Sequence, residues 1–514
     1  MNWLKVLIFI SVVICESQTY KILGVFQIPT GSHYILASKL FREIANRGHD
    51  VTFITPYVGK TKIKNLKEIP VVSLQTILNA NNTNGIYQME NTTPLEKAKY
   101  ITDLSYKFTN HLLGSEEVQN LLKSEETYDA VIIYQYLNDA LLGIGHHFKA
   151  PVILFSSMPL YVSESFLLSH PAPSSYVPNI MIEYTAHMNF WQRLRTAFYD
   201  ACIILHYNWI MLPKHRELVY KYIPGKPDLY DFLNNSSLLL INSHVSSYEA
   251  IPQVPNAVEI GGFHIEEPKK LPDHLQKFLD ESTNGVIAFS MGSILQSTDL
   301  PESKRNAILK TFAKLNENVL WKWEDDKLPG QPKNLKIMKW IPTSDVLAHP
   351  NVKAFISHGG LLSTMESMYH AVPMVGIPVF VDQKMNMAIG AANGYAVVVD
   401  YRNITEENLS IALKEVLNDP KFKNNMKKRS EIMRDRPLKP VESALYWIEY
   451  VIRHQGAHHL RYPGMDLTWY QRYLLDVAAF VTCAVLISVI VIKKILNLIL
   501  KQASKNVDKT KKNK

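Results

Sequence analysis

The chain has 514 residues, of which 47% are hydrophobic and 20% are charged. This is the composition of a folded protein with room for two domains, and it excludes a disordered chain. The net charge of +8 comes almost entirely from residues 493–514, which hold eight Lys and one Asp. Because the rest is nearly neutral, the charge does not indicate a nucleic-acid partner. A basic segment after an apolar stretch is typical of the cytoplasmic side of a membrane span.

The N-terminus has the pattern of a secretory signal peptide. Lys5 precedes the apolar residues 6–14, and Cys15-Glu16-Ser17 is a small-x-small sequence that suits cleavage near Ser17. We therefore predict a signal peptide over residues 1–17. Cys202 is then the single cysteine before the C-terminal apolar stretch, which excludes an internal disulfide there. Glycosylation sequons begin at Asn81, Asn91, Asn234, Asn235, Asn403 and Asn408.

Short apolar runs alternate with amphipathic helices from residue 20 onward. Residues 22–26, 51–54 and 130–134 have the pattern of strands, and residues 34–47 that of a helix. Such repeats form a parallel sheet covered by helices on both faces, with ligands beyond the carboxyl ends of the strands. His33 follows the first strand and opens the first helix, so we expect it in the cleft.

Two middle segments depart from this rhythm. Residues 181–222 are apolar and aromatic among scattered Arg, Lys and His. Two interpretations stay open for them: core helices of the first domain, or a surface that contacts a membrane, although an interfacial helix usually has a cleaner polar face. Residues 251–273 are rich in Pro and lack periodicity, which indicates a linker. The pattern restarts at Val286, so a second domain of the same class is expected.

A strand, a turn and a helix follow one another in the second half. Residues 352–357 predict a buried parallel strand, and His358, Gly359 and Gly360 form the turn after it. A helix starts at once, with Ser363 in its first turn. Its free N–H groups and the positive end of its dipole predict an anion site.

A second apolar run, residues 373–380, leads to Asp382 and Gln383. A carboxylate and an amide side by side can both hydrogen-bond the hydroxyls of a ligand. The pair therefore predicts that a polyol binds next to the anion.

The C-terminus has the pattern of a membrane anchor. Residues 474–492 are apolar with one charge, Asp476, and at ~1.5 Å per residue they nearly cross a bilayer. Lys493 and Lys494 follow them, which predicts a single-pass type I topology with the larger part in the lumen. The final residues, Lys511-Lys512-Asn513-Lys514, resemble the dilysine retrieval signal of endoplasmic reticulum membrane proteins, so that membrane is the expected location.

Positions between residues 340 and 386 resemble the signature of the UDP-glycosyltransferase family, whose animal members conjugate small lipophilic molecules with a nucleotide-activated sugar. In that family a Trp stacks on uracil, the His-Gly-Gly turn and next helix hold the diphosphate, a Glu binds ribose and an Asp-Gln pair binds the sugar. The resemblance implies these roles for Trp340, His358, Gly359, Gly360, Ser363, Glu366, Asp382 and Gln383.

Two further features belong to this resemblance. The loop 290–293 is similar to the family's second diphosphate contact, which implies donor contacts for Ser290, Gly292 and Ser293. Thr343 departs from the family, which usually has Gln at this position.

The resemblance also implies the architecture. Members share an α/β fold of two facing, doubly wound Rossmann-like domains of the GT-B type, with the acceptor in the first and the UDP-sugar in the second. A helix over residues 441–453 would cross back onto the first domain. Together with a C-terminal transmembrane helix, the predicted organisation is signal peptide 1–17, acceptor domain 18–250, linker 251–273, UDP-sugar domain 274–460, transmembrane helix 474–492 and cytoplasmic basic tail 493–514.

His33 matches the family's catalytic His. A neutral imidazole, with an ordinary pKa of ~6.5, can accept the proton of an acceptor hydroxyl. The family pairs this His with an Asp at the end of a strand, but here the strand ends at Gln135 and the nearest carboxylate is Asp139. Either Asp139 reaches His33 through a shifted loop, or Gln135 orients the ring, and Asp139 is the slightly favoured partner.

The sequence therefore predicts an inverting enzyme that transfers a hexose from a UDP-sugar to a small lipophilic acceptor. Asp382 and Gln383 suit the hydroxyls that glucose and glucuronate share, and residues 138–143 look like those of arthropod members, which favours glucose. Adjacent His pairs at 146–147 and 458–459 lack metal-ligand spacing, so neither a metal nor a cofactor is expected beside the UDP-sugar. A membrane-tethered lipophile carrier without turnover is the alternative, suggested by Thr343 and the missing strand-end Asp.

Overall fold

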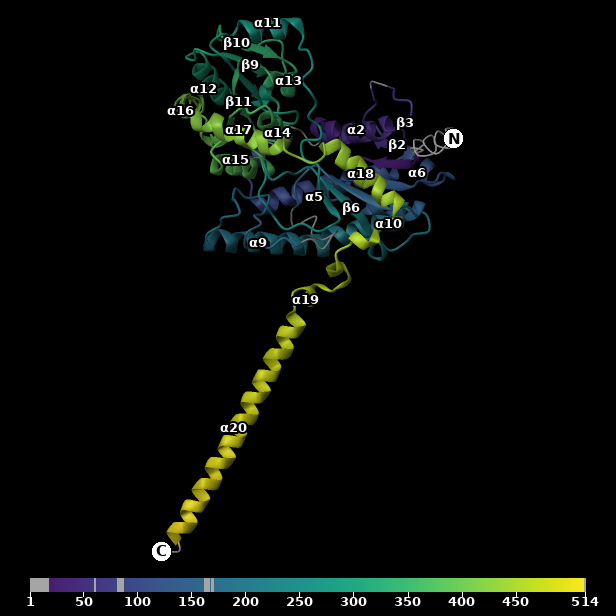
Figure 1. Ribbon diagram of the computed structural model, residues 1–514, viewed down its shortest axis with the longest axis vertical. Coiled ribbons are helices and arrows are strands. Elements are labelled where there is room, and N and C mark those ends of the chain that lie inside the picture. The colour runs from purple at the N-terminus through teal and green to yellow at the C-terminus, as the bar shows by residue number, and fades with distance from the viewer. Residues whose placement is uncertain (1–17, 60–61, 81–86, 161–166, 168–170, 513–514) are drawn as a thin grey trace, which may run out of the picture. The chain divides into compact units, whose positions relative to one another are not determined.

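The computed structural model describes residues 18–59, 62–80, 87–160, 167 and 171–512. The predicted signal peptide, the Asn81 sequon and the last two residues of the dilysine pattern lie outside these ranges. The chain divides into two compact units, Met1–Arg461 and Tyr462–Lys514. The larger unit holds two sheets, and the smaller unit holds the C-terminal helices (Figure 1).

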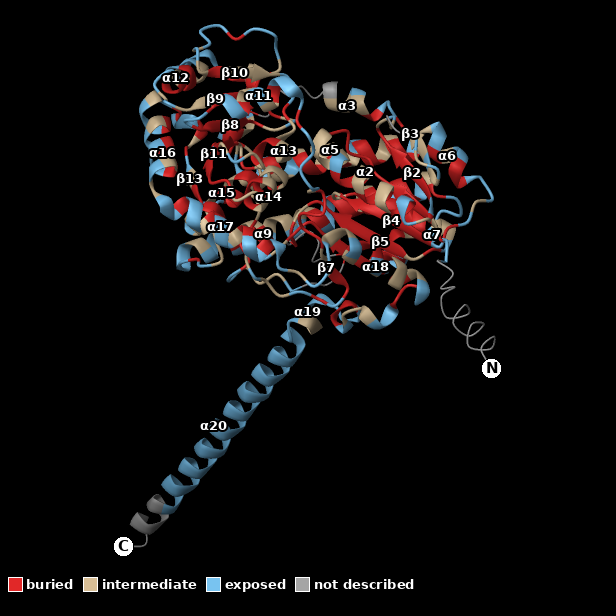
Figure 2. Ribbon diagram, turned by 45° about the horizontal axis from the view of Figure 1, so that its top comes forward, coloured by how far each residue is buried: buried red, intermediate tan, exposed pale blue. Residues whose placement is uncertain are grey.

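The first half of the larger unit is built on a seven-stranded parallel sheet in the order β3-β2-β1-β4-β5-β6-β7. The order reverses beside β1, which makes the sheet doubly wound as predicted. Its central strands are buried on both faces (Figure 2), which explains their continuous apolar sequences. The strands are β1 (Lys21–Val25), β2 (Asp50–Thr55), β3 (Leu66–Pro70), β4 (Ala130–Gln135), β5 (Val152–Ser156), β6 (Ser236–Ile241) and β7 (Ala257–Glu259).

The second half repeats the arrangement with a six-stranded parallel sheet in the order β10-β9-β8-β11-β12-β13. The strand order again reverses in the middle, between β8 and β11, so the ends of these two strands mark the expected ligand edge. The strands are β8 (Val286–Ser290), β9 (Asn318–Lys322), β10 (Leu335–Met338), β11 (Val352–Ser357), β12 (Met374–Gly376) and β13 (Ala396–Val398).

Helices cover both sheets, as parallel strands require. In the first half they are α2 (Gly31–Asn46), α3 (Leu74–Ala80), α5 (Pro94–Gly114), α6 (Glu116–Leu122), α7 (Leu142–Phe148), α9 (Phe190–His206) and α10 (Leu212–Tyr222), and a π-helical turn, η3 (Tyr207–Met211), joins the last two. In the second half they are α11 (Asp273–Glu281), α12 (Glu302–Phe312), α13 (Thr343–Leu347), α14 (Leu361–Tyr369), α15 (Asp382–Ala392), α16 (Glu406–Asn418) and α17 (Pro420–Arg434).

The helix α18 (Pro440–Arg453) follows the second domain in sequence but packs on the first. Its buried residues Ala444, Leu445, Ile448 and Val451 join the core formed by β1, β4 and α2. This is the packing predicted for residues 441–453.

Two segments differ from the prediction. The predicted linker 251–273 is not free of regular structure, because Ala257–Glu259 forms β7 and pairs with the end of β6. Three residues between prolines are too short for a periodic pattern to identify. The apolar run 373–380 is a strand only over Met374–Gly376, since Pro378 lacks the N–H that a continued ladder needs.

The smaller unit consists of η8 (Pro463–Asp466), α19 (Trp469–Arg472) and α20 (Leu475–Lys512). Residues Leu475–Asn506 are long and apolar enough to cross a membrane, with a mean hydropathy of 2.7, and none of the most apolar stretch is buried against protein. The helix begins where the span 474–492 was predicted and also includes most of the predicted basic tail.

Candidate active site

The His-Gly-Gly turn lies at the carboxyl end of β11, where strand order reverses. Ser357 ends the strand, and its Oγ accepts a hydrogen bond from the Gly359 N–H at 3.2 Å. Gly359 has a φ of +81°, and a Cβ there would lie 2.5 Å from Cγ of Met387, so this position needs glycine. Gly360 then begins α14 without a side-chain cap. The N–H groups of the first turn are therefore available for an anion.

His358 is held between two loops. A Cβ on Gly292, whose φ is +91°, would lie 2.5 Å from Cε1 of His358, so the loop after β8 contacts the imidazole directly. Within that loop, the Gly292 N–H donates to Oγ of Ser290 at 3.2 Å. Burial, and secondarily the charge of Lys322, lower the pKa of His358 to about 4. The ring is therefore neutral at pH 7.

Ser293 links the two halves of the larger unit. A Cβ on Gly31, the first residue of α2, would lie 3.5 Å from Cβ of Ser293. The loop after β8 therefore faces the start of the helix that carries His33. The two loop clusters predicted for donor and acceptor therefore lie close together within this unit.

Asp382 and Gln383 stand at the start of α15 in fixed conformations. Oε1 of Gln383 accepts from the N–H groups of Val379 and Phe380, each at 2.9 Å, which leaves its amide N–H groups as donors. These hydrogen bonds stabilise the unusual backbone conformation of Val381, whose φ is positive at +49°. Burial raises the pKa of Asp382 to about 6 despite a hydrogen bond from Asn386.

Asn386 is a residue that the sequence reasoning missed. Its Nδ2 donates to Asp382 Oδ2 at 2.8 Å and to the Gly359 carbonyl oxygen at 2.9 Å. It therefore joins the predicted sugar pair to the predicted diphosphate turn. The signal was present, because residues four apart on a helix share a face.

Trp340 is 58% exposed, as a side chain that stacks on a ligand would be. Nζ of Lys322, at the end of β9, lies 5.9 Å from its ring centroid and 2.7 Å from Glu324 Oε1. Lys322 is buried and its charge acts on His358 as well. Sequence reasoning did not select this lysine, because no local pattern marks it.

Glu366 lies on α14 beside His264, with 3.9 Å between Oε1 and Nε2. Burial raises the pKa of Glu366 to about 8, and it lowers the pKa of His264 to about 4. Both groups are therefore neutral at pH 7, and the contact is not an ion pair. His264 comes from the segment 251–273, and no local pattern in that segment predicts its position beside Glu366.

His33 contacts one tyrosine in β4 and a second tyrosine just after that strand. Its Nδ1 lies 2.8 Å from the hydroxyl of Tyr134, and its ring centroid lies 5.5 Å from that of Tyr136. Burial lowers the pKa of His33 to about 4. Tyr136 also interacts electrostatically with Asp382, so it lies between the predicted base and the predicted sugar site.

Asp139 does not contact His33. It is buried in the short helix η2 (Asp139–Leu141), and its neighbours are Tyr207 and Gln135. Burial raises the pKa of Asp139 to about 6, although hydrogen bonding with those two residues opposes the rise. Nδ1 of His33 is bonded to Tyr134 instead of to either predicted partner, and the hydrogen bonds of Asp139 are made with Tyr207 and Gln135.

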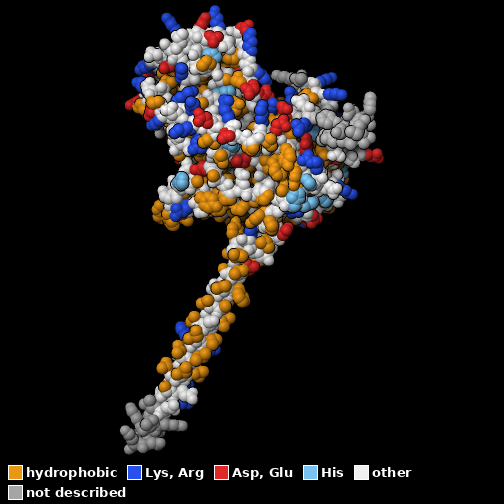
Figure 3. Space-filling model, viewed as in Figure 1, with side chains coloured by type: hydrophobic (Ala, Val, Ile, Leu, Met, Phe, Trp, Pro, Cys, Tyr) orange, Lys and Arg blue, Asp and Glu red, His pale blue; other side chains and the backbone are white. Residues whose placement is uncertain are grey.

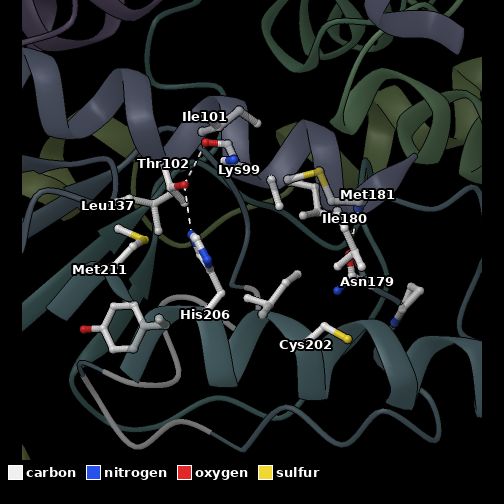
Figure 4. A pocket seen from close by; sticks show the side chains of 15 residues that line it. Lys99, Ile101, Thr102, Leu137, Asn179, Ile180, Met181, Cys202, His206 and Met211 are labelled. Atoms are coloured by element: carbon white, nitrogen blue, oxygen red, sulfur yellow. Dashed lines mark hydrogen bonds between the residues drawn. The ribbon is translucent and has the colours of Figure 1, made fainter. Parts of the chain in front are cut away.

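A cavity of about 320 Å³ opens beside this site in the first half of the larger unit (Figure 4). Its wall is mostly apolar, and one of the polar contacts among its lining residues joins His206 Nε2 to Thr102 Oγ1 at 3.1 Å. Leu137 lines the cavity and directly follows Tyr136, which contacts His33. The remaining lining comes from α5, α9, η3 and residues 178–181.

In the ranges that the structure describes, no group of three or more His, Cys, Asp or Glu is placed to hold a metal ion. His146 and His147 lie on α7, and His458 and His459 on a short 3-10 helix. That the reaction needs no metal or cofactor stays a prediction.

Comparison with known proteins extends the resemblance to nearly the whole chain. A family model described as UDP-glucoronosyl and UDP-glucosyl transferase matches residues 23–513. The chain is 38% identical over 485 residues to UDP-glycosyltransferase UGT5 of Dactylopius coccus, covering 92% of this chain and 91% of that protein. It is 32% identical over 485 residues to UDP-glucuronosyltransferase 2C1 of Oryctolagus cuniculus, covering 90% and 95%.

The solved structures agree on the fold. The crystal structure of the glycotransferase of kitacinnamycin aligns with a TM-score of 0.55 and 17% identity, over 84% of this chain and 99% of that one. The predicted α/β fold of two Rossmann-like domains of the GT-B type, with an apolar C-terminal helix as a transmembrane candidate, is thereby confirmed. The chain belongs to the UDP-glycosyltransferase family and is an enzyme that uses a UDP-sugar donor.

Proposed function

We propose that this enzyme transfers a hexose, glucose in preference to glucuronate, to a hydroxyl of a small lipophilic acceptor with inversion at the anomeric carbon, and that His33 is the general base. The observation that carries the proposal is the position of His33. His33 lies at the start of α2 and contacts Tyr136, which in turn interacts with Asp382. Leu137, the residue after Tyr136, lines the apolar cavity.

In the proposed step the acceptor oxygen attacks the anomeric carbon. The new bond from that carbon to the acceptor oxygen forms as the bond to the UDP oxygen breaks, and the acceptor proton moves to Nε2 of His33. Nε2 must be unprotonated, so Nδ1 carries the hydrogen and donates it to Tyr134. A base whose pKa is about 4 is weak. Proton transfer therefore comes late, as the oxygen becomes acidic during attack.

The leaving UDP gains negative charge that the second domain is built to stabilise. We assign this role to the uncapped start of α14, to the turn at Gly359 and Gly360, and to the loop that contains Ser290, Gly292 and Ser293. Trp340 would stack on uracil, and Glu366 would bind the ribose. Ser363, in the first turn of the helix α14, would support the His-Gly-Gly loop. The positive charge of Lys322 acts on His358, so it would also help to stabilise the negative charge of the leaving UDP.

Asp382 and Gln383 would bind the sugar hydroxyls. Asn386 and the loop N–H groups hold them in place before the donor arrives. The preference for glucose rests on relatives, because UDP-glucosyltransferase 2 of Dactylopius coccus is 34% identical over 93% of this chain. We further propose a single-pass type I location in the endoplasmic reticulum membrane, with both domains in the lumen.

The test is a donor panel on membranes that contain the full chain. UDP-glucose and UDP-glucuronate, each labelled in the sugar, are incubated with a set of phenols, and labelled product and free UDP are measured. Glucoside formation is expected, with loss of turnover in His33→Ala while UDP still binds. Equal turnover in His33→Ala would refute the base assignment. Phenol binding without UDP release would identify a carrier.

A further inference from the structure

We infer that Glu90 is a positioning residue for the proposed sugar site, because it bonds Lys384 in the first turn of α15. Asp382 and Gln383, the proposed sugar pair, stand in the same turn, so the inference rests on the function proposed for them. Glu90 belongs to the first half of the larger unit, in the short helix η1 (Met89–Asn91), whereas Lys384 belongs to the second half. Oε1 of Glu90 lies 2.9 Å from Nζ of Lys384, so the two halves meet directly beside the sugar pair.

The carboxylate of Glu90 is buried between cations. Its side chain is 1% exposed, and Nε of Arg402 lies 3.4 Å from the same Oε1 atom that Lys384 contacts. Oε2 is buried as well, and no residue that the structure describes donates a hydrogen bond to it. Acidic and basic side chains mix over the visible surface of the larger unit (Figure 3), where water screens them. A carboxylate that is removed from water depends instead on the cations beside it.

The segment that carries Glu90 is fixed by the second sheet. Tyr87 is 7% exposed and belongs to the hydrophobic core of that sheet. Its ring stacks on that of Tyr401 with 5.3 Å between centroids, and its hydroxyl donates to the Gln296 carbonyl oxygen at 3.0 Å. Residues 87–91 therefore pack with the second half although α5 of the first half follows them in the chain. This packing brings Glu90 to α15.

Lys384 is unfavourably placed within α15 itself. A cation in the first turn of a helix lies at the positive end of the helix dipole, which raises its free energy. The backbone just before this turn is strained, because Val381 has a positive φ of +49°. The bond to Glu90 offsets the charge of Lys384 and thereby stabilises the turn on which the orientation of the sugar pair depends.

The helix α5 contacts the same place from the first half. The ring of Tyr100 meets that of Phe380 edge to face, with 6.4 Å between centroids, and the Phe380 N–H is one of the two donors that hold the sugar pair. Lys97, one turn earlier on α5, is buried and interacts electrostatically with both Glu90 and Lys384. Without the charge of Glu90, Lys97 and Lys384 would repel each other and push the start of α15 away from α5.

The experiment compares sugar binding with nucleotide binding in membranes that contain the full chain. The KM of the UDP-sugar that the donor panel selects, the kcat and the inhibition constant of UDP are measured for Glu90→Gln. We expect the KM to rise about fivefold to tenfold, because the sugar pair loses its orientation. The inhibition constant of UDP should stay within about twofold, since UDP has no sugar to contact that pair, and kcat should stay within about threefold.

Two further variants separate positioning from a general loosening of the two halves. Arg429 on α17 donates to the Val245 carbonyl oxygen at 3.3 Å, so it also joins the halves, and it contacts Asn393 at the other end of α15. Arg429→Gln should therefore leave the KM within about twofold. Adding Lys384→Met to Glu90→Gln should bring the KM back to within about threefold of wild type, because the repelling charge is removed.

If Glu90→Gln does not fold, as judged by thermal melting, Lys384→Glu replaces it, since a second carboxylate repels Glu90 and should raise the KM at least as much. An unchanged KM would overturn the inference. So would a parallel rise in the UDP inhibition constant, an equal rise of the KM in Arg429→Gln, or a double variant as impaired as Glu90→Gln. Asp382→Asn tests the proposed function separately. An unchanged KM there would refute the sugar pair itself, whereas a raised KM there, with none in Glu90→Gln, would refute only the role of Glu90.

Discussion

Nδ1 of His33 lies 2.8 Å from the hydroxyl oxygen of Tyr134. Burial raises the pKa of Tyr134, so its hydroxyl stays neutral at all working pH values. The tyrosine can fix the orientation and tautomer of the imidazole, but it contributes no negative charge to stabilise an imidazolium. In this respect it differs from a carboxylate at the same place.

Removing that hydroxyl should reduce turnover without affecting donor binding. We expect Tyr134→Phe to lower kcat about tenfold, since one hydrogen bond of about 1–1.5 kcal/mol no longer orients the base. The KM for the UDP-sugar should not change. Tyr395→Phe is the control, because Tyr395 is also fully buried but belongs to the second domain. Identical kcat values for the two variants would show that Tyr134 does not position His33.

The pH dependence of kcat should report the low pKa of His33. A general base is active when neutral, and burial lowers the pKa of His33, the proposed base, to about 4. With saturating donor and an acceptor that does not ionise, kcat should therefore stay level from pH 7 to pH 5 and fall near pH 4. A melting curve at each pH excludes unfolding as the cause. Because the pKa of Asp382 is raised to about 6, the profile is repeated with Asp382→Asn, and an inflection near pH 6.5 that persists there would mean that His33 titrates as an ordinary histidine.

Asp139 should prove to be a stability residue rather than a catalytic one. Its folded pKa of about 6 lies above the unfolded value, so the folded state binds this proton more tightly. The stability that it contributes is complete below the unfolded pKa and is lost as the pH rises through about 6. Asp139→Asn removes the buried charge, so it should raise the free energy of unfolding above pH 6 by up to about 3 kcal/mol.

The measurement for Asp139→Asn is thermal melting at pH 7.5 and pH 4.5, together with kcat. The melting temperature should rise at pH 7.5, and the gain should shrink at pH 4.5, while kcat stays within about threefold of wild type. Asp103→Asn is the control, because the Asp103 side chain is 46% exposed on α5. Loss of kcat with unchanged melting would instead restore Asp139 as the partner of His33.

Glu366 should tolerate the loss of its charge. Burial raises its pKa to about 8, so the side chain is mostly protonated at pH 7, and Glu366→Gln imitates that state. We expect the KM for the UDP-sugar to rise by less than about threefold in Glu366→Gln, but by about tenfold or more in Glu366→Ala, which removes both hydrogen-bonding atoms. Initial rates against donor concentration measure this. Equal effects of the two substitutions would show that the carboxylate charge is what binds.

Gly292 should be required for its lack of a side chain. In Gly292→Ala the new Cβ would meet the His358 ring at 2.5 Å, so we expect a severalfold higher KM for the donor. Gly225→Ala separates this clash from backbone strain, because Gly225 has a similar φ of +79° and no atom within 4 Å of the added Cβ. Both variants should lose about 1 kcal/mol of stability. Equal donor KM values in the two would contradict the contact with His358.

The sequence predicted the parts of the site that are local. The strand, turn and helix from Val352 to Tyr369 follow one another without a long connection, so periodicity and glycine placement suffice. The partner of His33 was not predictable in this way. Successive residues of β4 face opposite sides of the sheet, so Tyr134 faces His33 while Gln135 lies beside Asp139 on the other side.

Contacts between distant segments were also beyond the sequence. His264 reaches Glu366, and Lys322 lies near Trp340, through pairings that only the folded chain creates. The surface of α9 was undecided for a related reason. Residues 202, 203 and 206 line the cavity while Trp191, Leu194 and Phe198 of the same helix are exposed, and a helix that is apolar on two sides gives no clear hydrophobic face.

Tyr136 and Leu137 are neighbours in the chain, yet one contacts His33 and the other lines the cavity. Leu137 has a φ of +53°, which turns the backbone between them. A substitution at Leu137 that admits a bulkier substrate would therefore also move Tyr136 and disturb the His33 imidazole. Under the proposed function, substitutions at lining residues farther from His33 than Leu137 should change the substrate range with less effect on the imidazole.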